Sequence, residues 1–245
     1  MKRSDERSAT PPAMDADAVR QAIEWAILSR RSVRAFLPTP VSQETVESIL
    51  DVARFAATGV NIQPWRVHVV TGHAKDRICA AIQRINSHST LDETCTDEWD
   101  YYPREWISPY LERRRAVGWK LYGLLGIEKG DKQRMQAQHS RNYQFFDAPV
   151  GLFFTINRVM QEGSLLDYGM FLQNIMIAAR AHGLSTCPQA AFMKYHKVIA
   201  EQLRLHTDER FVVGMSLGFA DHSCIENTLV TERAEVDSFT IFYSD

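Results

Sequence analysis

The sequence has few of the residues, and none of the signatures, that usually mark a metal, disulfide or nucleotide site. Its four cysteines lie far apart and form no C-x-x-C pair: Cys79, Cys95, Cys187 and Cys224. This argues against a zinc site and a disulfide framework, and it is typical of proteins from a reducing cytoplasm. No G-x-G-x-x-G follows the first expected strand, and no G-x-x-x-x-G-K-S/T is present. We therefore expect neither a Rossmann domain nor a P-loop.

Charge and hydrophobic runs exclude two further classes of protein. With 28 Lys and Arg against 30 Asp and Glu, the formal net charge is −2, so no basic excess indicates nucleic-acid binding. The longest strongly apolar run, residues 148–156, is too short to span a membrane. Residues 1–14 are polar and lack the apolar stretch of a signal peptide, while Asp5 and Glu6 are untypical of a mitochondrial transit peptide. We expect a disordered tail there and a cytoplasmic protein.

The rest of the chain is typical of one globular domain, residues 15–245. Hydrophobic residues make up 45% and charged residues 24% of the 245, enough to bury a substantial core. Apolar residues recur at helical spacing over 15–29, 42–57, 75–86, 131–143, 165–182 and 195–205, and Gly59 lies where a C-cap glycine of the second of these helices is expected. Extended, apolar stretches predict strands at 65–71, 150–157 and 210–218, and a strand or arm at 239–243. Helices that alternate with about four strands indicate an α+β or mixed α/β class.

Two polar motifs stand out against this background. Residues 30–34 hold three arginines and Ser32, and guanidinium groups with a hydroxyl suit a phosphate. About 25 residues later, Asn61 and Gln63 precede Pro64 and Trp65, and their carboxamides suit a ring with N–H and C=O edges. Together they predict the two ends of one phosphorylated ring cofactor. The alternative is a solvated helix end, where cations favour the helix dipole.

This pair of motifs resembles the FMN-dependent nitroreductase family, in its nitrobenzoate-reductase-like branch. The likeness runs from Ala18 to Phe242 and includes residues 142–150, 167–184 and 217–220, followed by Arg233. It implies an α+β nitroreductase-like fold with a central mixed, mainly antiparallel sheet flanked by helices. It also implies an intertwined homodimer with FMN bound between subunits, in which the helix at 165–181 packs on its twin. Residues 88–130 would form a helical, aromatic-rich lid.

The resemblance also implies the residues that bind FMN. They are Arg30, Arg31, Ser32, Arg34, Thr58, Asn61, Gln63, Arg141, Asn142, Pro188, Gln189, Ala190, Ala191 and Arg233. Arg30, Arg31, Ser32 and Arg233 would hold the phosphate, and Arg34 would lie near the ribityl chain and pyrimidine edge. Backbone N–H groups near Ala190 and Ala191 would face flavin N5 and O4.

Two segments depart from the family pattern. The usual Pro-Ser-x-x-Asn is here residues 57–61, which keep a hydroxyl at Thr58 but lose the proline. The segment like Pro-x-Glu-Gly is here residues 188–191, which lack the glutamate but keep the backbone donors.

The activity implied is NAD(P)H-dependent reduction of nitroaromatic or related electrophiles, by ping-pong hydride transfer through flavin N5 with no catalytic side chain and no metal. Tyr101, Trp106 and Phe145 are the substrate contacts considered, although packing is the alternative for each ring. The run Arg113–Arg115 suits an acidic substrate or, alternatively, is a solvated helix face. The same fold also hosts reductive dehalogenases and flavin-fragmenting enzymes, and a non-catalytic flavin-binding protein is the remaining alternative.

Overall fold

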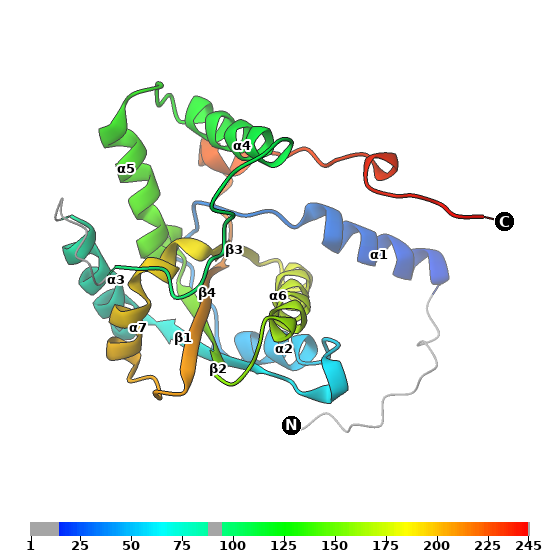
Figure 1. The fold of residues 1–245 in the computed structure, drawn as a ribbon, viewed down its shortest axis with the longest axis horizontal. Helices are drawn as coiled ribbons and strands as arrows, with labels where there is room; N and C mark the ends of the chain where they lie inside the picture. Colours follow the sequence, from blue (N-terminus) through cyan, green and yellow to red (C-terminus); the bar gives the residue numbers. More distant parts are fainter. Residues whose placement is uncertain (1–14, 88–94, 245) are drawn as a thin grey trace.

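A four-stranded sheet forms the centre of the computed structural model, which describes residues 15–87 and 95–244 (Figure 1). The strands are β1 (Trp65–Thr71), β2 (Val150–Asn157), β3 (Ser185–Gln189) and β4 (Glu209–Gly218). Their order is β1-β2-β4-β3, and every pair is antiparallel. A parallel component enters through the isolated bridge between Ser32 and Thr186. The predicted α+β class and mainly antiparallel sheet are confirmed, whereas the predicted tail lies outside the described residues.

Helices cover both faces of this sheet (Figure 1). Their bounds are α1 Ala16–Ser29, α2 Gln43–Ala53, α3 Gly72–Asn86, α4 Tyr110–Leu124, α5 Lys132–Ser140, α6 Gly163–Ala181 and α7 His196–Leu203. One core cluster joins α2 and α6 to the sheet, and a second joins α3, α7 and the short 3₁₀ segments to it. Strands β2 and β4 are buried almost throughout because they lie between the two clusters.

Local sequence signals set several helix starts. The Ser42 side chain accepts a hydrogen bond from the Thr45 N–H, and the Asp131 side chain accepts one from the Arg134 N–H. Such caps satisfy donors that the first helical turn leaves open. The expected glycine cap at Gly59 is wrong, because α2 ends at Ala53 and Gly59 instead begins the 3₁₀ segment η1 (Gly59–Asn61). The Ala53 carbonyl already accepts from the Ala56 N–H and from Asn174 Nδ2.

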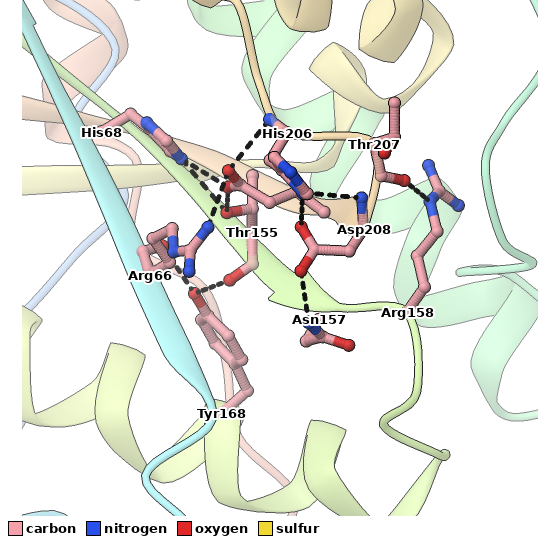
Figure 2. Close-up of polar contacts among 10 residues, drawn as sticks. Arg66, His68, Thr155, Asn157, Arg158, Tyr168, His206, Thr207 and Asp208 are labelled. Atoms are coloured by element: carbon pink, nitrogen blue, oxygen red, sulfur yellow. Dashed lines mark hydrogen bonds and ion pairs between the residues drawn. The ribbon is translucent and has the colours of Figure 1, made fainter.

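A buried carboxylate, that of Glu209, fixes the start of β4, and Figure 2 shows its labelled partners Arg66, His68 and Thr155. Glu209 is held by Arg66 Nη1 and His68 Nε2, both at 2.9 Å, and by the Thr155 hydroxyl. These partners come from β1 and β2, so the cluster joins three strands at one end of the sheet. Tyr168 on α6 adds hydrogen bonds from its hydroxyl to the carbonyls of Arg66 and Thr155.

Part of the apolar surface is uncovered in a single chain. Helix α6 is expected to pack on its twin in a homodimer, and in the single chain Leu166 is 73% exposed and Met170 36% exposed. Helix α1 buries only Ala26, and the C-terminal arm exposes Phe242 at 85%. The arm is irregular rather than a strand and extends from the body on the same side as α1 (Figure 1). No helix of the described residues is long and apolar enough to cross a membrane.

Candidate functional site

A cavity of about 640 Å³ lies between the end of α1, the end of β3 and the C-terminal segment. We call it the arginine cavity, since four arginines line it. Its polar and proline lining consists of Arg30, Arg31, Ser32, Arg34, Gln173, Pro188, Thr231 and Arg233. The remaining lining residues are apolar, and none is a carboxylate. The structure thus brings together every residue predicted to bind the phosphate.

The chain folds this way because residues 30–34 run as an extended segment beside β3. The Val33 N–H donates to the Thr186 carbonyl at 3.1 Å, and Val33 is buried. Alternate residues of an extended segment point to opposite sides, so Ser32 and Arg34 face away from the core. Asn227 Oδ1 accepts from the Arg34 N–H at 2.8 Å, and Arg34 Nη1 donates to the Ser32 carbonyl at 3.1 Å.

The electrostatics of this cavity favour an anion. Burial lowers the pKa of Arg30, and repulsion from Arg233 lowers it further. Arg233 Nη1 donates to the Thr231 carbonyl and hydroxyl and to the Glu232 carbonyl, none of which neutralises its charge. Several guanidinium groups that face one space without a lining carboxylate fit a phosphate dianion, which accepts charge-assisted hydrogen bonds from such forks.

Cys187 precedes the lining residue Pro188 but does not itself line the cavity, and it is not a nucleophile. Burial raises the pKa of Cys187 to about 11, against the smaller effect of Arg34 nearby. Burial likewise raises the pKa of Cys79 to about 11. Thiols with such a pKa stay protonated near neutral pH and are unreactive.

The predicted ring-binding loop, residues 57–63, does not line the arginine cavity. Thr58 is half-buried, while Asn61 and Gln63 are exposed. The loop contacts α6 at Asp167, and the cavity contacts α6 at Gln173 and Met176. These contacts lie about two helical turns apart along α6. In a single chain, therefore, the predicted phosphate site and the predicted ring-binding loop lie beside different turns of α6 and do not form one pocket.

The residues at the end of β3 and just after it are only partly as predicted. Pro188 lines the arginine cavity, and Ala190 and Ala191 begin the 3₁₀ segment η3 (Ala190–Tyr195). Gln189 is buried, and its Nε2 donates to the Asn142 carbonyl at 2.8 Å. The Ser216 hydroxyl lies 2.7 Å from Gln189 Oε1. Gln189 and Asn142 thus bind each other, and Ser216 is a partner that sequence reasoning missed.

Arg141 is neutralised within the protein. It forms ion pairs with Glu226 and, at 3.1 Å, with Asp147. Burial acts to lower the pKa of Arg141, but these two carboxylates raise it above its ordinary value. Arg141 thereby ties the η2 segment (Arg141–Asp147) to the C-terminal segment around η4 (Ile225–Thr228). The sequence carries no signal for this pairing, because Glu226 is 85 residues away.

The expected substrate residues lie in different environments. Tyr101 and Trp106 belong to an aromatic chain that continues through Tyr102, with Arg114 stacked over Trp106 at 4.7 Å. Tyr101 is half-exposed, whereas Trp106 is half-buried between these neighbours. The structure corrects the prediction for Phe145. The Phe145 ring is fully buried and fills the space beside Gly151, so that a Cβ atom on residue 151 would lie 2.4 Å from the ring. Phe145 is a core residue and contacts no substrate space.

Comparison with known proteins agrees with this geometry. The sequence matches the nitroreductase family over residues 27–219. It is 40% identical to 4-nitrobenzoate reductase of Pseudomonas putida over 216 residues, 88% of this chain and 93% of that protein. It is also 40% identical to nitrobenzene nitroreductase of Ectopseudomonas oleovorans over 220 residues, 90% of this chain and 96% of that protein.

Solved structures give the same result for the fold. The crystal structure of FMN-dependent nitroreductase NfnB from Mycobacterium smegmatis in complex with NADPH superposes with a TM-score of 0.87 at 30% identity. The superposition covers 92% of this chain and all of that one. The predicted nitroreductase-like fold is therefore confirmed, and the chain belongs to the nitroreductase family.

Proposed function

We propose that this protein is an FMN-dependent NAD(P)H oxidoreductase that reduces nitroaromatic or related electrophilic compounds. The observation that carries the proposal is the arginine cavity, where Arg30, Arg31, Arg34 and Arg233 face one space with no lining carboxylate. Such a site suits the phosphate of FMN. Relatives named for reduction of 4-nitrobenzoate and nitrobenzene, each 40% identical, support the acceptor class. The structural relative with NADPH supports the hydride donor.

The chain's own residues would bind and orient the cofactor. Arg30, Arg31, Ser32 and Arg233 would hold the phosphate, and Arg34 would supply a cation that favours negative charge on the pyrimidine ring. Backbone N–H groups near Ala190 and Ala191 would hold the ring. When bound, FMN supplies the hydride chemistry, and the protein supplies binding and electrostatics. Among the described residues no cluster of His, Cys, Asp and Glu could hold a metal ion.

A homodimer completes this proposal. Thr58, Asn61 and Gln63 do not line the arginine cavity of their own chain. Leu166 and Met170 leave an apolar face of α6 open, and α1 and the C-terminal arm expose further apolar side chains. Uncovered apolar surface of this extent indicates a protein partner. We infer that a second copy covers these surfaces and that FMN binds between the subunits, each a single domain over residues 15–245.

We assign substrate binding to the segment that precedes α4, which contains Tyr101 and Trp106. Tyr101 offers a half-exposed ring that can stack on a nitroaromatic, while Trp106 and Arg114 hold the segment in place. Because nicotinamide and acceptor would use the same face of the flavin in turn, we expect ping-pong kinetics.

Anaerobic assays, followed by one assay in air, separate this proposal from its alternatives. The purified protein is expected to be yellow, to lose flavin absorbance on addition of NADPH, and to recover it with nitrobenzene or 4-nitrobenzoate. Release of halide from a haloaromatic would instead indicate dehalogenation, and oxygen-dependent consumption of FMN would indicate flavin fragmentation. Bound flavin that no nicotinamide reduces would favour a non-catalytic flavin-binding protein.

A further inference from the structure

The loop at residues 57–63 has an unusual backbone conformation. Val60, Asn61 and Gln63 have φ values of 44°, 62° and 50°, in the left-handed region that non-glycine residues seldom adopt. Val60 is β-branched, which makes this conformation still less favourable. Its side chain is 94% exposed, and those of Asn61 and Gln63 are exposed as well. Within the chain, apolar packing of these side chains therefore does not select this conformation, and hydrogen bonds hold it.

Most of those contacts are local. The Asn61 N–H donates to the Thr58 carbonyl at 3.2 Å, the Ile62 N–H donates to the Gly59 carbonyl at 3.1 Å, and Gln63 Nε2 donates to the Asn61 carbonyl at 3.1 Å. These bonds shape the loop but do not place it in the molecule. Within the part of the chain that the structure describes, one hydrogen bond joins residues 57–63 to a distant element: the Gly59 N–H donates to Asp167 Oδ2 at 3.2 Å.

Helix α6 holds the flanks of the loop from the same side. Asn174 Nδ2 donates to the Ala53 carbonyl at 3.4 Å before the loop. After it, the ring of Phe171 stacks on Trp65 with centroids 4.4 Å apart and planes 8° from parallel. Asp167, Phe171 and Asn174 are spaced four and three residues apart, so they share one face of the helix. Asp167 is the member of this face that contacts the loop itself.

The chemistry of Asp167 fits a role in positioning. Its side chain is buried, with 9% exposure, and no ion pair to it occurs among the described residues. A buried carboxylate is costly unless hydrogen bonds satisfy it. Its bond to an N–H is charge-assisted and therefore stronger and more directional than a bond between neutral groups. Strain of this kind persists where the surroundings over-determine it, and it gathers at functional sites.

We propose that Asp167 is a positioning residue that fixes the strained loop, so that the carboxamides of Asn61 and Gln63 are presented to FMN in one orientation. This inference rests on the proposed function, because it takes FMN as the group that the loop contacts. Asp167 acts through the Gly59 N–H and does not itself touch the cofactor.

The test compares three variants of the full-length protein by the FMN dissociation constant, measured from flavin fluorescence on dilution, and by thermal unfolding. Asp167→Ala removes the acceptor and is expected to weaken FMN binding about tenfold. Asp167→Asn keeps an oxygen acceptor and should restore most of the affinity. Glu209→Gln is the matched control: it also removes a buried, hydrogen-bonded carboxylate, but at the start of β4, outside both the loop and the arginine cavity. It should lower stability and leave FMN affinity unchanged.

A double-mutant cycle separates positioning from general stability. In a background of Asn61→Ala with Gln63→Ala, Asp167→Ala should cause no further loss of FMN affinity, because residues that act as one unit are not additive. Losses that add, or unchanged affinity in Asp167→Ala, would overturn the inference. Asp167→Leu fills the buried space without an acceptor and replaces the alanine variant if that variant does not fold.

The proposed function can fail separately. If the wild-type protein binds no FMN, the proposed function is wrong and this inference falls with it. If Asn61→Ala with Gln63→Ala leaves FMN binding intact while Arg30→Ala reduces it, the phosphate site stands and the role of the loop is refuted. If both of those variants weaken binding and Asp167→Ala does not, only the inference about Asp167 is overturned.

Discussion

At the scale of single residues, the arginine cavity gathers charge that its own lining does not neutralise. Removing one of its guanidinium groups removes a charge-assisted hydrogen bond, worth roughly 1.5–3 kcal/mol. Arg30→Ala should therefore bind FMN about ten- to a hundredfold more weakly, purify pale and regain activity with added FMN. The measurement is the ratio of flavin to protein absorbance after gel filtration.

A matched control for this prediction is Arg20→Ala. Arg20 is an exposed arginine on α1 that pairs with Asp17 and Glu24, outside the cavity, so its loss should leave FMN retention unchanged. If Arg30→Ala and Arg233→Ala both retain FMN like the wild-type protein, the phosphate assignment is wrong.

Glu209 gives a prediction about stability and pH. Burial acts to raise its pKa, but hydrogen bonds from Thr155, His68 and Arg66 lower it to about 2, from an ordinary 4.5 (Figure 2). A depressed pKa means that the unfolded state binds more protons, so this stability is complete above about pH 4.5 and is lost as pH falls toward 2. The amount is on the order of 3 kcal/mol at most.

Urea unfolding of the wild-type protein and of Glu209→Gln from pH 7 to pH 3 measures this effect. The variant should be less stable at pH 7, and the difference should narrow below pH 4.5, because protonation removes the same charge from the wild-type protein. A difference that stays constant across this range would show that Glu209 does not carry the acid sensitivity.

At the scale of elements, the sequence predicted best where one physical signal decides the outcome. The strands at 65–71 and 150–157 were predicted with the bounds that β1 and β2 have. Residues 65–71 are rich in β-branched residues, which favour strands, and residues 150–157 form the continuous apolar run that is typical of a buried strand. The predicted role of Gly59 was wrong. A glycine that follows helical periodicity is typical of a C-cap, but the sequence does not show whether tertiary contacts end the helix earlier. For Phe145 the sequence could not decide between substrate contact and packing, because only the fold shows that its ring packs against Gly151.

The segment from Trp99 to α4 carries the prediction about substrate choice. Its base is fixed, since Glu98 Oε2 accepts from the Phe211 N–H at 2.7 Å and Trp99 Nε1 donates to the Phe211 carbonyl at 3.2 Å. Beyond this base, Trp106 is held chiefly by rings and by Arg114. Trp106→Ala should raise KM for nitrobenzene severalfold, as such ring contacts are worth roughly 0.5–1.5 kcal/mol. FMN affinity should not change.

Arg114 can be tested in the same assay. Because Arg114 stacks on Trp106, the effects of Arg114→Gln and Trp106→Ala on KM should not be additive.

Arg113 and Arg115 are exposed, and neutralising both tests whether they attract an anionic acceptor. If they do, KM for 4-nitrobenzoate should rise more than KM for nitrobenzene, and the gap should shrink with salt. Equal effects on the two acceptors would identify the run as a solvated helix face.

At the scale of the whole molecule, the two polar motifs that revealed the family do not meet within one chain. Residues 30–34 line the arginine cavity, and residues 57–63 lie about two turns away along α6. Both motifs can be recognised in the sequence, but the distance between them cannot, because it depends on which residues of α6 each of them contacts. A second copy that packs on the open face of α6 is the simplest way to bring a ring-binding loop to a phosphate site.

The last prediction tests this assembly. Light scattering of the wild-type protein should give about twice 28.0 kDa. Leu166→Glu with Met170→Glu places two charges on the open face of α6, where Leu166 is 73% exposed, so the isolated fold should tolerate them. A charge buried in an interface is costly, so this variant should be monomeric and should lose FMN together with its partner. Val159→Glu is the control, because Val159 is equally exposed, at 73%, but lies before α6 in the turn that follows β2. A monomeric double variant that still binds FMN as tightly as the wild-type protein would show that each chain binds the cofactor alone, and the shared site would have to be abandoned.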